Sequence, residues 1–307
     1  MVAERFGFAG RLLAAAVVLA LPAVGLRAEG RPLRILTSFY PMYVHALNVA
    51  WAVNGVRVGN LTEPITGCLH DFQLTTVHMR ALADADVLVV NGGGMESFLD
   101  KVIAQRPGLK VIDASLGIEF IRGAGGDGHE HGTGGVNPHV WVSPELAIRQ
   151  VRNIAEGLAT IDPARAGDYR ANADVYVGKL EALRSRMRVE LGPFLGRRVV
   201  TFHETFPYFA REFGLEIAAV VQRDPGTEPS PKELAETIDL VRSAKVGAVF
   251  AEPQYPMAGA EAVRRETGVK LGLLDPVVTG PDSPPEARDA YLRAMERNLS
   301  VLKETLR

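Results

Sequence analysis

The chain of 307 residues has one cysteine, Cys68, and two tryptophans. A single cysteine excludes an internal disulfide, so packing of the apolar core has to stabilise the fold. The sequence also lacks a CxxC pair and an HExxH segment, the compact spacings that mark many structural and catalytic zinc sites. Spacing alone therefore does not assemble a metal site in this sequence.

Neither sign of charge is in excess, since 34 basic residues face 36 acidic ones. A protein of this balance lacks the positive field that holds nucleic acid or anionic lipid, and we expect no nucleic-acid partner. Hydrophobic residues make up 47% of the chain and charged residues 23%, which is an ordinary globular composition. The length suggests about two domains.

The first segment has the pattern of a secretory signal. Arg5 and Arg11 provide a basic start, residues 12–21 carry no charge, and Pro22 follows. Ten apolar residues are too few for a membrane-spanning helix, which needs about 20, so an N-terminal anchor is the weaker interpretation. We predict a signal peptide over residues 1–28, and its removal leaves 31 basic and 35 acidic residues. Cys68 lies far from this segment, so we expect a free periplasmic protein without a lipid anchor.

Apolar, strand-like runs alternate with helical patterns along most of the chain. The strand candidates are residues 33–39, 56–61, 87–90, 111–112, 198–202, 216–222, 246–251 and 270–274. Such alternation is typical of parallel sheets with helices on both faces. The fold class that we predict is α/β, with two doubly wound domains over residues 29–161 and 191–307. A glycine-rich loop over residues 121–137 is expected at the surface.

Residues 162–190 are predicted to form one long, stiff helix that connects the two domains. Its apolar positions recur at spacings of mostly three or four, as in a helix with one buried face. They are Tyr169, Ala173, Tyr176, Leu180, Leu183 and Met187. Asp162 followed by Pro163 reads as a capping side chain and a first-turn proline. The alternative is an ordinary surface helix of one domain.

Two candidate metal ligands directly follow predicted strands. His203 comes after the strand at 198–202, and Asp275 comes after the strand at 270–274. Ligands of open α/β sheets bind at the carboxyl ends of the strands, so both residues are expected at one rim. His45 and His78 fall in helical stretches, where we interpret them as structural. His129 and His131 lie in the glycine-rich loop, where they could collect metal loosely.

Four segments carry the remaining signal: Gly67-Cys68-Leu69-His70-Asp71-Phe72, Asn137-Pro138-His139-Val140-Trp141, Thr201-Phe202-His203-Glu204-Thr205 and Leu274-Asp275-Pro276. In this order they resemble the ligand segments of the zinc and manganese receptors of ABC transporters, the ZnuA/TroA-like solute-binding proteins of cluster A-I. The resemblance covers nearly all of residues 32–307. It departs at Leu69, where the family has proline, and at Gln73-Leu74, where it has Glu-Pro.

The resemblance implies four metal ligands: His70, His139, His203 and Asp275. It also implies that two come from each domain and meet in the cleft between the domains. Asp71, Glu204 and Glu252 are candidate partners that would orient the ligand imidazoles. The function implied is that of a periplasmic receptor, a monomer, which captures a divalent metal and delivers it to a membrane permease.

Three imidazoles and one carboxylate form a set that suits tetrahedral zinc, whereas manganese prefers more oxygen donors. We therefore expect Zn²⁺ as cargo, with Mn²⁺ or Fe²⁺ as the alternatives. A catalytic zinc keeps one position open for water, and four protein ligands leave none. This argues against an enzyme, although a secreted metallohydrolase and an adhesion module are the competing functions.

Overall fold

The computed structural model describes residues 31–63, 69, 72–122, 135–221 and 229–307. Residues Pro32–Arg307 form one unit. The predicted signal peptide, Cys68, His70, Asp71, His129 and His131 lie outside the described residues. No helix in the described part of the chain is long and apolar enough to cross a bilayer.

Eight parallel strands form two four-stranded sheets with the same order of connection. The first sheet has the order β2-β1-β3-β4 and the second the order β6-β5-β7-β8. The strands are β1 Leu33–Thr37, β2 Val56–Asn60, β3 Val87–Val90, β4 Lys110–Asp113, β5 Arg198–Thr201, β6 Glu216–Val220, β7 Ala248–Ala251 and β8 Lys270–Leu273. All eight predicted strands are present, each within two residues of its expected start and end.

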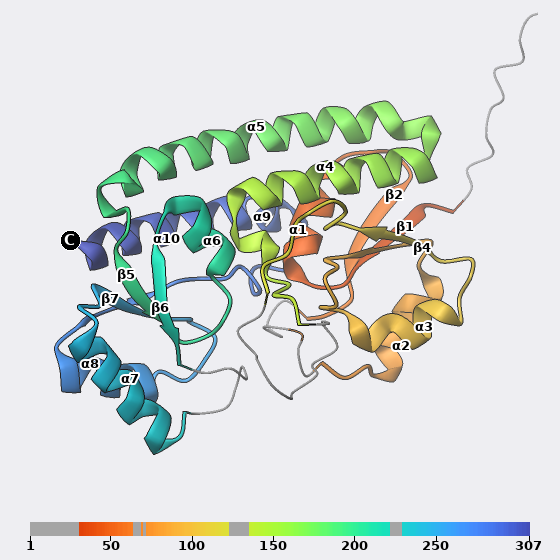
Figure 1. The fold of residues 1–307 in the computed structure, drawn as a ribbon. Coiled ribbons are helices and arrows are strands. Elements are labelled where there is room, and N and C mark those ends of the chain that lie inside the picture. Colours follow the sequence, from red (N-terminus) through yellow and green to blue (C-terminus); the bar gives the residue numbers. More distant parts are fainter. Residues whose placement is uncertain (1–30, 64–68, 70–71, 123–134, 222–228) are drawn as a thin grey trace, which may run out of the picture. The chain divides into compact units, whose positions relative to one another are not determined.

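Helices cover both faces of each sheet (Figure 1). The α-helices are α1 Tyr40–Val49, α2 Thr76–Asp84, α3 Asp100–Ala104, α4 Pro144–Ile161, α5 Ala166–Leu191, α6 Pro207–Phe213, α7 Pro231–Ser243, α8 Ala258–Thr267, α9 Pro284–Ala287 and α10 Ala290–Leu306. Short 3₁₀ turns are η1 Ser97–Leu99, η2 Val140–Val142, η3 Pro163–Arg165 and η4 Gly192–Phe194. The predicted α/β class with two doubly wound sheets is confirmed.

Alternate residues of the central strands enter different cores, because successive side chains of a strand point to opposite faces. In β3, Val87 and Val89 join one core, while Leu88 and Val90 join another against α2 and α3. In β7, Phe250 joins that same first core, while Val249 packs against α7 and α8. The first core is therefore continuous from one sheet to the other and also contains α1, α4, α5 and α10.

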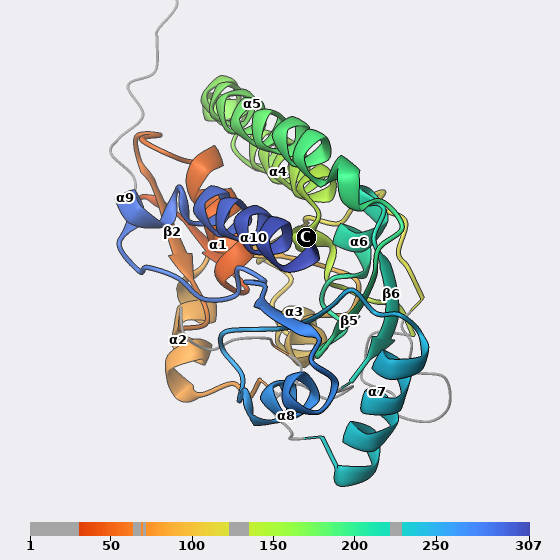
Figure 2. The ribbon, with the colours of Figure 1, turned by 90° about the vertical axis from the view of Figure 1, so that its left-hand side faces the viewer.

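Helix α5 runs across the helices that cover both sheets. It packs along α4 and also contacts α1, α6 and α10, and α4 and α5 lie side by side in both ribbon views (Figures 1 and 2). The predicted buried face is confirmed, since Tyr169, Tyr176, Leu180 and Met187 are all fully or almost fully buried. The division into separate domains at 29–161 and 191–307 stays a prediction.

The start of this helix differs from the prediction. The α-helix begins at Ala166 after the 3₁₀ turn Pro163–Arg165, and the Asp162 side chain makes no capping hydrogen bond. Instead, Asp162 Oδ2 accepts hydrogen bonds from Arg165 Nη1 at 2.7 Å and from Tyr169 Oη at 3.1 Å. The prediction that Asp162 caps the helix was wrong, because these two side chains are stronger donors to the carboxylate oxygen than the backbone N–H groups of the first turn.

His45 is fully buried in α1, where its ring lies 6.0 Å from that of Tyr176 on α5 and 5.2 Å from that of Tyr291 on α10. Neither of its ring nitrogens has a hydrogen-bond partner among the described residues. Burial lowers the pKa of His45 from 6.5 to about 3, because an imidazolium would lose its hydration there. The structural role expected for His45 thus places a neutral histidine where three helices meet.

We predict that His45 makes the metal-free protein less stable in mild acid. Between its folded and unfolded pKa values only the unfolded state binds the proton, so the free energy of unfolding falls as the pH drops below 6.5. This group should remove about 2 kcal/mol between pH 8 and pH 5. Denaturant unfolding in the presence of a chelator measures it. In His45→Leu the loss over that range should be smaller by this amount, and parallel pH profiles of the two proteins would refute the assignment.

Candidate metal site

His203 and Glu252 follow two neighbouring strands of the second sheet. β5 ends at Thr201 and β7 ends at Ala251, and the two strands are paired in parallel. From β5 the chain continues to β6 on one side of β5, and it later returns to form β7 on the other side. The carboxyl ends of β5 and β7 therefore form the topological switch point of this sheet. Open α/β sheets bind their ligands at such a point.

Glu252 contacts the His203 ring. Its Oε1 lies 3.3 Å from His203 Nδ1, and both side chains are only 4% exposed. Gln254 Nε2 donates a hydrogen bond of 2.8 Å to Glu252 Oε2, and the Tyr255 ring packs edge-on to the His203 ring with 4.2 Å between centroids. The carboxylate is thus fixed on one side of the imidazole, as expected of a group that orients a metal ligand.

Asp275 lies at the end of the next strand, β8. Its Oδ1 accepts a hydrogen bond of 2.8 Å from the Val277 amide, and its Oδ2 forms an ion pair of 2.9 Å with Arg297. The Asn298 side chain on α10 makes two hydrogen bonds of 2.8 Å to the Asp275 backbone. Its Oδ1 accepts from the Asp275 N–H, and its Nδ2 donates to the Asp275 carbonyl. Val277 has a φ of 63°, a left-handed conformation that is strained for a β-branched residue. These contacts fix the carboxylate at this position.

His139 stands just before the short turn Val140–Val142 and is 5% exposed. The Asn137 side chain accepts a hydrogen bond of 2.9 Å from the His139 amide, and the same Oδ1 lies 3.0 Å from His139 Nδ1. A proton on Nδ1 would leave the lone pair on Nε2, which is the form in which a histidine binds metal through that nitrogen. Trp141 packs against the ring with 5.2 Å between centroids.

Hydrogen bonds connect the His139 segment to both of the other two segments. Asn137 Nδ2 donates to the carbonyl of Glu204, next to His203, at 2.8 Å. Trp141 Nε1 donates to the carbonyl of Pro276, next to Asp275, at 2.7 Å. The structure therefore brings the segments that carry His139, His203 and Asp275 into direct contact, although up to 135 residues separate the bonded partners in the sequence.

The fourth predicted ligand, His70, lies outside the described residues, as do Asp71 and Cys68. Among the described residues, no three His, Cys, Asp or Glu side chains are grouped so that they could hold a metal ion, and this includes His139, His203 and Asp275. The four-residue ligand set thus remains a prediction.

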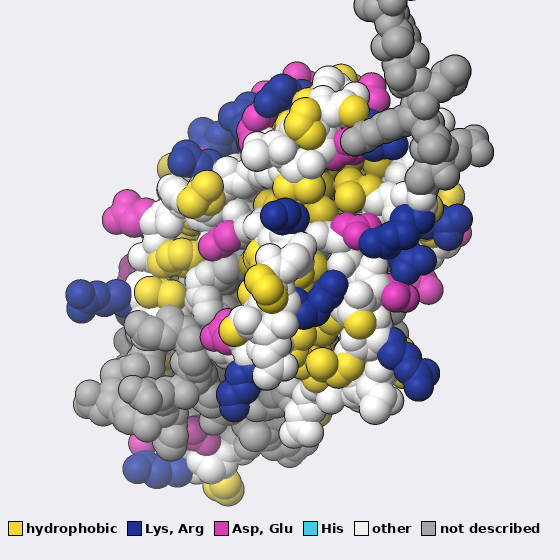
Figure 3. Space-filling model, turned by 90° about the vertical axis from the view of Figure 1, so that its right-hand side faces the viewer, with side chains coloured by type: hydrophobic (Ala, Val, Ile, Leu, Met, Phe, Trp, Pro, Cys, Tyr) yellow, Lys and Arg dark blue, Asp and Glu magenta, His cyan; other side chains and the backbone are white. Residues whose placement is uncertain are grey.

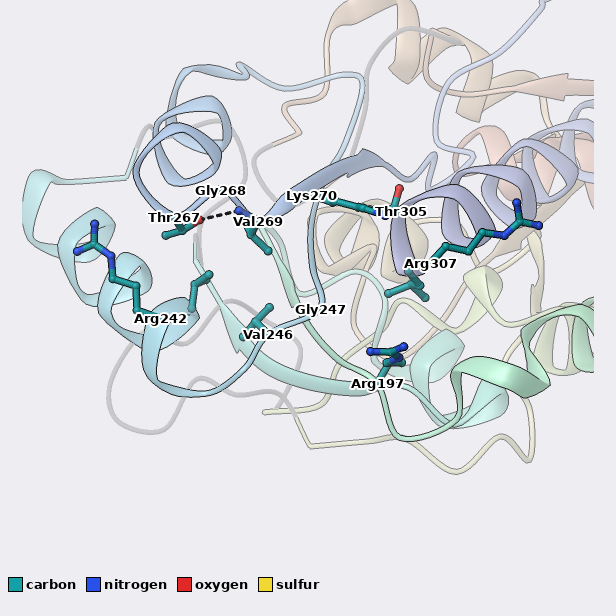
Figure 4. Close-up of a pocket in the computed structure, with 12 residues that line it drawn as sticks. Arg197, Arg242, Val246, Gly247, Thr267, Gly268, Val269, Lys270, Thr305 and Arg307 are labelled. Carbon is teal, nitrogen blue, oxygen red and sulfur yellow. Dashed lines mark hydrogen bonds between the residues drawn. The ribbon is translucent and has the colours of Figure 1, made fainter.

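A cavity of about 500 Å³ lies elsewhere, at the amino end of the second sheet (Figure 4). Basic residues stand around it, among them Arg197, Arg242 and Lys270. Helices α7, α8 and α10 all end there, and basic side chains at helix C-termini offset the negative end of the helix dipole. In Figure 4 the Arg242 and Arg307 side chains point in opposite directions, away from each other. This cavity is remote from the carboxyl ends of the strands and does not belong to the predicted metal site.

Comparison with known proteins identifies the family. Residues 35–305 match the family model described as "Zinc-uptake complex component A periplasmic". The chain belongs to this family. The family prediction is confirmed, and the description names the role that the sequence led us to expect, that of the periplasmic component of a zinc-uptake system.

Individual members of the family are similar over most of this chain. The zinc-binding lipoprotein AdcA of Streptococcus pneumoniae is 31% identical over 290 residues, which cover 91% of this chain and 56% of AdcA. This chain thus spans about half the length of the AdcA proteins that it matches. The high-affinity zinc uptake system protein ZnuA of Bacillus subtilis is 27% identical over 91% of this chain and 89% of its own length.

Solved structures agree with the fold. The solute-binding protein FpvC of Pseudomonas aeruginosa, in complex with Mn²⁺, has a TM-score of 0.77 and 33% identity over 90% of this chain and 98% of its own. Zn(II)-bound AdcA of Streptococcus pneumoniae has a TM-score of 0.75 and 29% identity over 90% of this chain and 58% of its own.

Several contacts of the site were not predicted from the sequence. Asn137, Arg297 and Asn298 touch the predicted ligands, and Asn91 and Glu96 support the His139 segment from the first sheet. Asn91 could have been found, because it directly follows β3 as His203 follows the end of β5. Arg297 gave no signal, since it looks like an ordinary polar residue of an amphipathic helix.

We predict that Trp141→Phe lowers the free energy of unfolding by about 2–3 kcal/mol. The change leaves the Pro276 carbonyl without its donor and a small cavity around the ring, because Trp141 is fully buried. Denaturant unfolding followed by circular dichroism measures the loss.

The other tryptophan is the control. Trp51 is only partly buried, with Arg288 over its ring at 4.0 Å, so Trp51→Phe should change the stability by less than about 1 kcal/mol. Equal losses in the two variants would show that the bond from Trp141 to Pro276 contributes nothing particular.

Proposed function

We propose that this chain is a receptor that captures one Zn²⁺ through His70, His139, His203 and Asp275 and delivers it to the permease of an ABC transporter. The observation that carries the proposal is the joining of the His139 segment to the neighbours of His203 and Asp275 by two hydrogen bonds. A metal held by these residues would sit at the switch point of the second sheet, where α/β folds bind ligands.

The groups around the two histidines support a metal-binding role. Asn137 Oδ1 lies at His139 Nδ1, and Glu252 lies at His203 Nδ1. Metal-binding histidines usually donate the hydrogen of their other ring nitrogen to an oxygen, which fixes the tautomer and makes the ligand more basic. Each of the two predicted histidine ligands that are described has such an oxygen beside it.

Zinc is the cargo that the ligand chemistry favours, with Mn²⁺ or Fe²⁺ as the alternative. Nitrogen-rich four-coordination suits Zn²⁺ better than Mn²⁺. The metals bound in the related structures differ, Zn(II) in AdcA and Mn²⁺ in FpvC. The ligand set leaves no open metal position, so we expect transport without turnover of a substrate.

The remaining features of the proposal concern location and partners. The predicted signal segment and the family's periplasmic description support a periplasmic location. On the face in Figure 3, basic and acidic side chains are interspersed. We propose a monomer with two α/β domains, residues 29–161 and 191–307, joined by the helix predicted at 162–190.

We predict one zinc per chain in the mature protein, and loss of zinc affinity by at least ~100-fold in His203→Ala. The metal-free protein would be offered equal amounts of zinc, manganese, iron and copper, and the bound metal counted by mass spectrometry. Competition with a chelator would then give the zinc affinity of each variant. His78→Ala is the control, because the His78 side chain accepts a hydrogen bond from the N-cap residue Thr75 of α2 and His78 is not among the predicted ligands.

The outcomes of this experiment differ in what they overturn. Preference for manganese or iron would keep the receptor and change its cargo. Absence of tight metal from the unaltered protein would overturn the receptor function. Equal zinc affinity of His203→Ala and His78→Ala would remove His203 from the site.

We predict that Glu252→Gln weakens zinc binding by about 10–100-fold while one zinc per chain is still bound at high zinc concentration. The amide keeps the size of the side chain but lacks the negative charge beside His203 Nδ1. Glu212→Gln is the matched control, since the Glu212 side chain is 2% exposed and pairs with Arg184 rather than with a predicted ligand. Zinc affinities within twofold of each other in the two variants would contradict a role for Glu252 in orienting His203.

A further inference from the structure

A second buried polar cluster lies at the switch point of the first sheet. Ser38 directly follows β1, Asn91 directly follows β3, and Glu96 comes shortly after. Ser38 and Asn91 are fully buried, and Glu96 is 5% exposed. Burying a carboxyl group costs free energy unless the group is hydrogen-bonded, so the partners of Glu96 have to be identified. We call Ser38, Asn91, Gly92 and Glu96 the Asn91–Glu96 cluster.

Glu96 accepts three hydrogen bonds within this cluster. Its Oε1 accepts from Ser38 Oγ at 2.7 Å and from the Asn91 amide at 2.7 Å, and its Oε2 accepts from the Gly92 amide at 3.1 Å. Burial raises the pKa of Glu96 to about 7, against the effect of these donors. Gly92 has a φ of 86°, and a Cβ there would collide with the Asp113 and Ser115 side chains, so only glycine fits.

The backbone held by Glu96 directs the Asn91 side chain at the His139 segment. Asn91 Nδ2 donates a hydrogen bond of 2.9 Å to the carbonyl of Pro138, which is the peptide bond that precedes His139. Asn91 Oδ1 accepts from Gln150 Nε2 on α4 at 2.9 Å, and this bond fixes the orientation of the amide. Asn91 is therefore held in two places. Glu96 binds its backbone N–H, and Gln150 binds its side-chain oxygen.

We infer that Asn91, fixed by Glu96, is a positioning residue that sets the orientation of His139 for metal binding, an inference that rests on the proposed function. The contact lies in the first sheet, whereas Glu204 and Pro276 hold the same segment from the second half of the chain. His139 is thus fixed on one side by Asn91 and on the other by the elements that carry His203 and Asp275.

Asn91→Asp tests the inference with almost no change in size. The new carboxylate keeps an acceptor for Gln150 but turns a negatively charged oxygen towards the Pro138 carbonyl in place of the donor. We expect the zinc affinity to fall about 10–100-fold. The visible spectrum of the Co²⁺-loaded protein should also change, because a displaced imidazole alters the coordination.

Asn153→Asp is the matched control on α4. Asn153 Nδ2 also holds a loop through carbonyls, donating to Ala114 at 2.7 Å and to Leu116 at 3.0 Å, but this loop carries none of the predicted ligands. Both variants should lose stability, and only Asn91→Asp should lose zinc affinity and alter the Co²⁺ spectrum. Zinc affinities within twofold of each other in the two variants would overturn the inference.

A measurement without metal separates this inference from the proposed function. In the metal-free protein, the ¹⁵N signals of the His139 ring should shift in Asn91→Asp and stay in place in Asn153→Asp. If the unaltered protein binds no zinc, the receptor function fails, while these signals still show whether Asn91 positions His139, and unchanged signals overturn it. Should Asn91→Asp not fold, Asn91→Ser removes the same donor without adding charge.

Discussion

The hydrogen bond from the indole of Trp141 to the carbonyl of Pro276 is the contact on which the site depends most. The Trp141 side chain is fully buried, and the Phe39 ring packs edge-on against its ring with 4.9 Å between centroids. The backbone carbonyl of Trp141 accepts a hydrogen bond of 2.8 Å from Tyr291 Oη. Phe39 belongs to the half of the chain that forms the first sheet. Tyr291 belongs to α10, which packs on β8 of the second sheet. Trp141 thus ties the turn after His139 to both halves of the structure.

A continuous core makes this arrangement stiff. The inner faces of both sheets pack into one apolar core together with α1, α4, α5 and α10, and such an interior is packed too densely to deform gradually. Glu212 on α6 adds a polar connection, because it accepts hydrogen bonds from Ser143 at the start of α4 and from Arg184 on α5. Large hinge motions between the two sheets would break these contacts.

The two switch points have different tasks in this fold. The one in the second sheet presents His203 and Glu252, and the one in the first sheet presents Asn91 and Glu96, which reach no predicted ligand directly. The sheets share one strand order, yet the groups at their switch points differ. His139 lies in the loop before α4, and Asn91 of the first sheet binds this loop through the Pro138 carbonyl. The two sheets are thus linked to the predicted ligand segments through backbone carbonyls as well as through side chains.

The sequence by itself determined the strands, the α/β class and the position of His203 and Asp275 at one rim. These features depend on local periodicity and on the rule that parallel strands end together. It did not determine where α5 begins, because Tyr169 and Arg165 bind Asp162 only in the folded chain. Nor did it show the bonds from Asn91 to Pro138 and from Trp141 to Pro276, whose partners lie 47 and 135 residues apart. Contacts of that range follow from how the packed elements meet, and only the tertiary structure decides this.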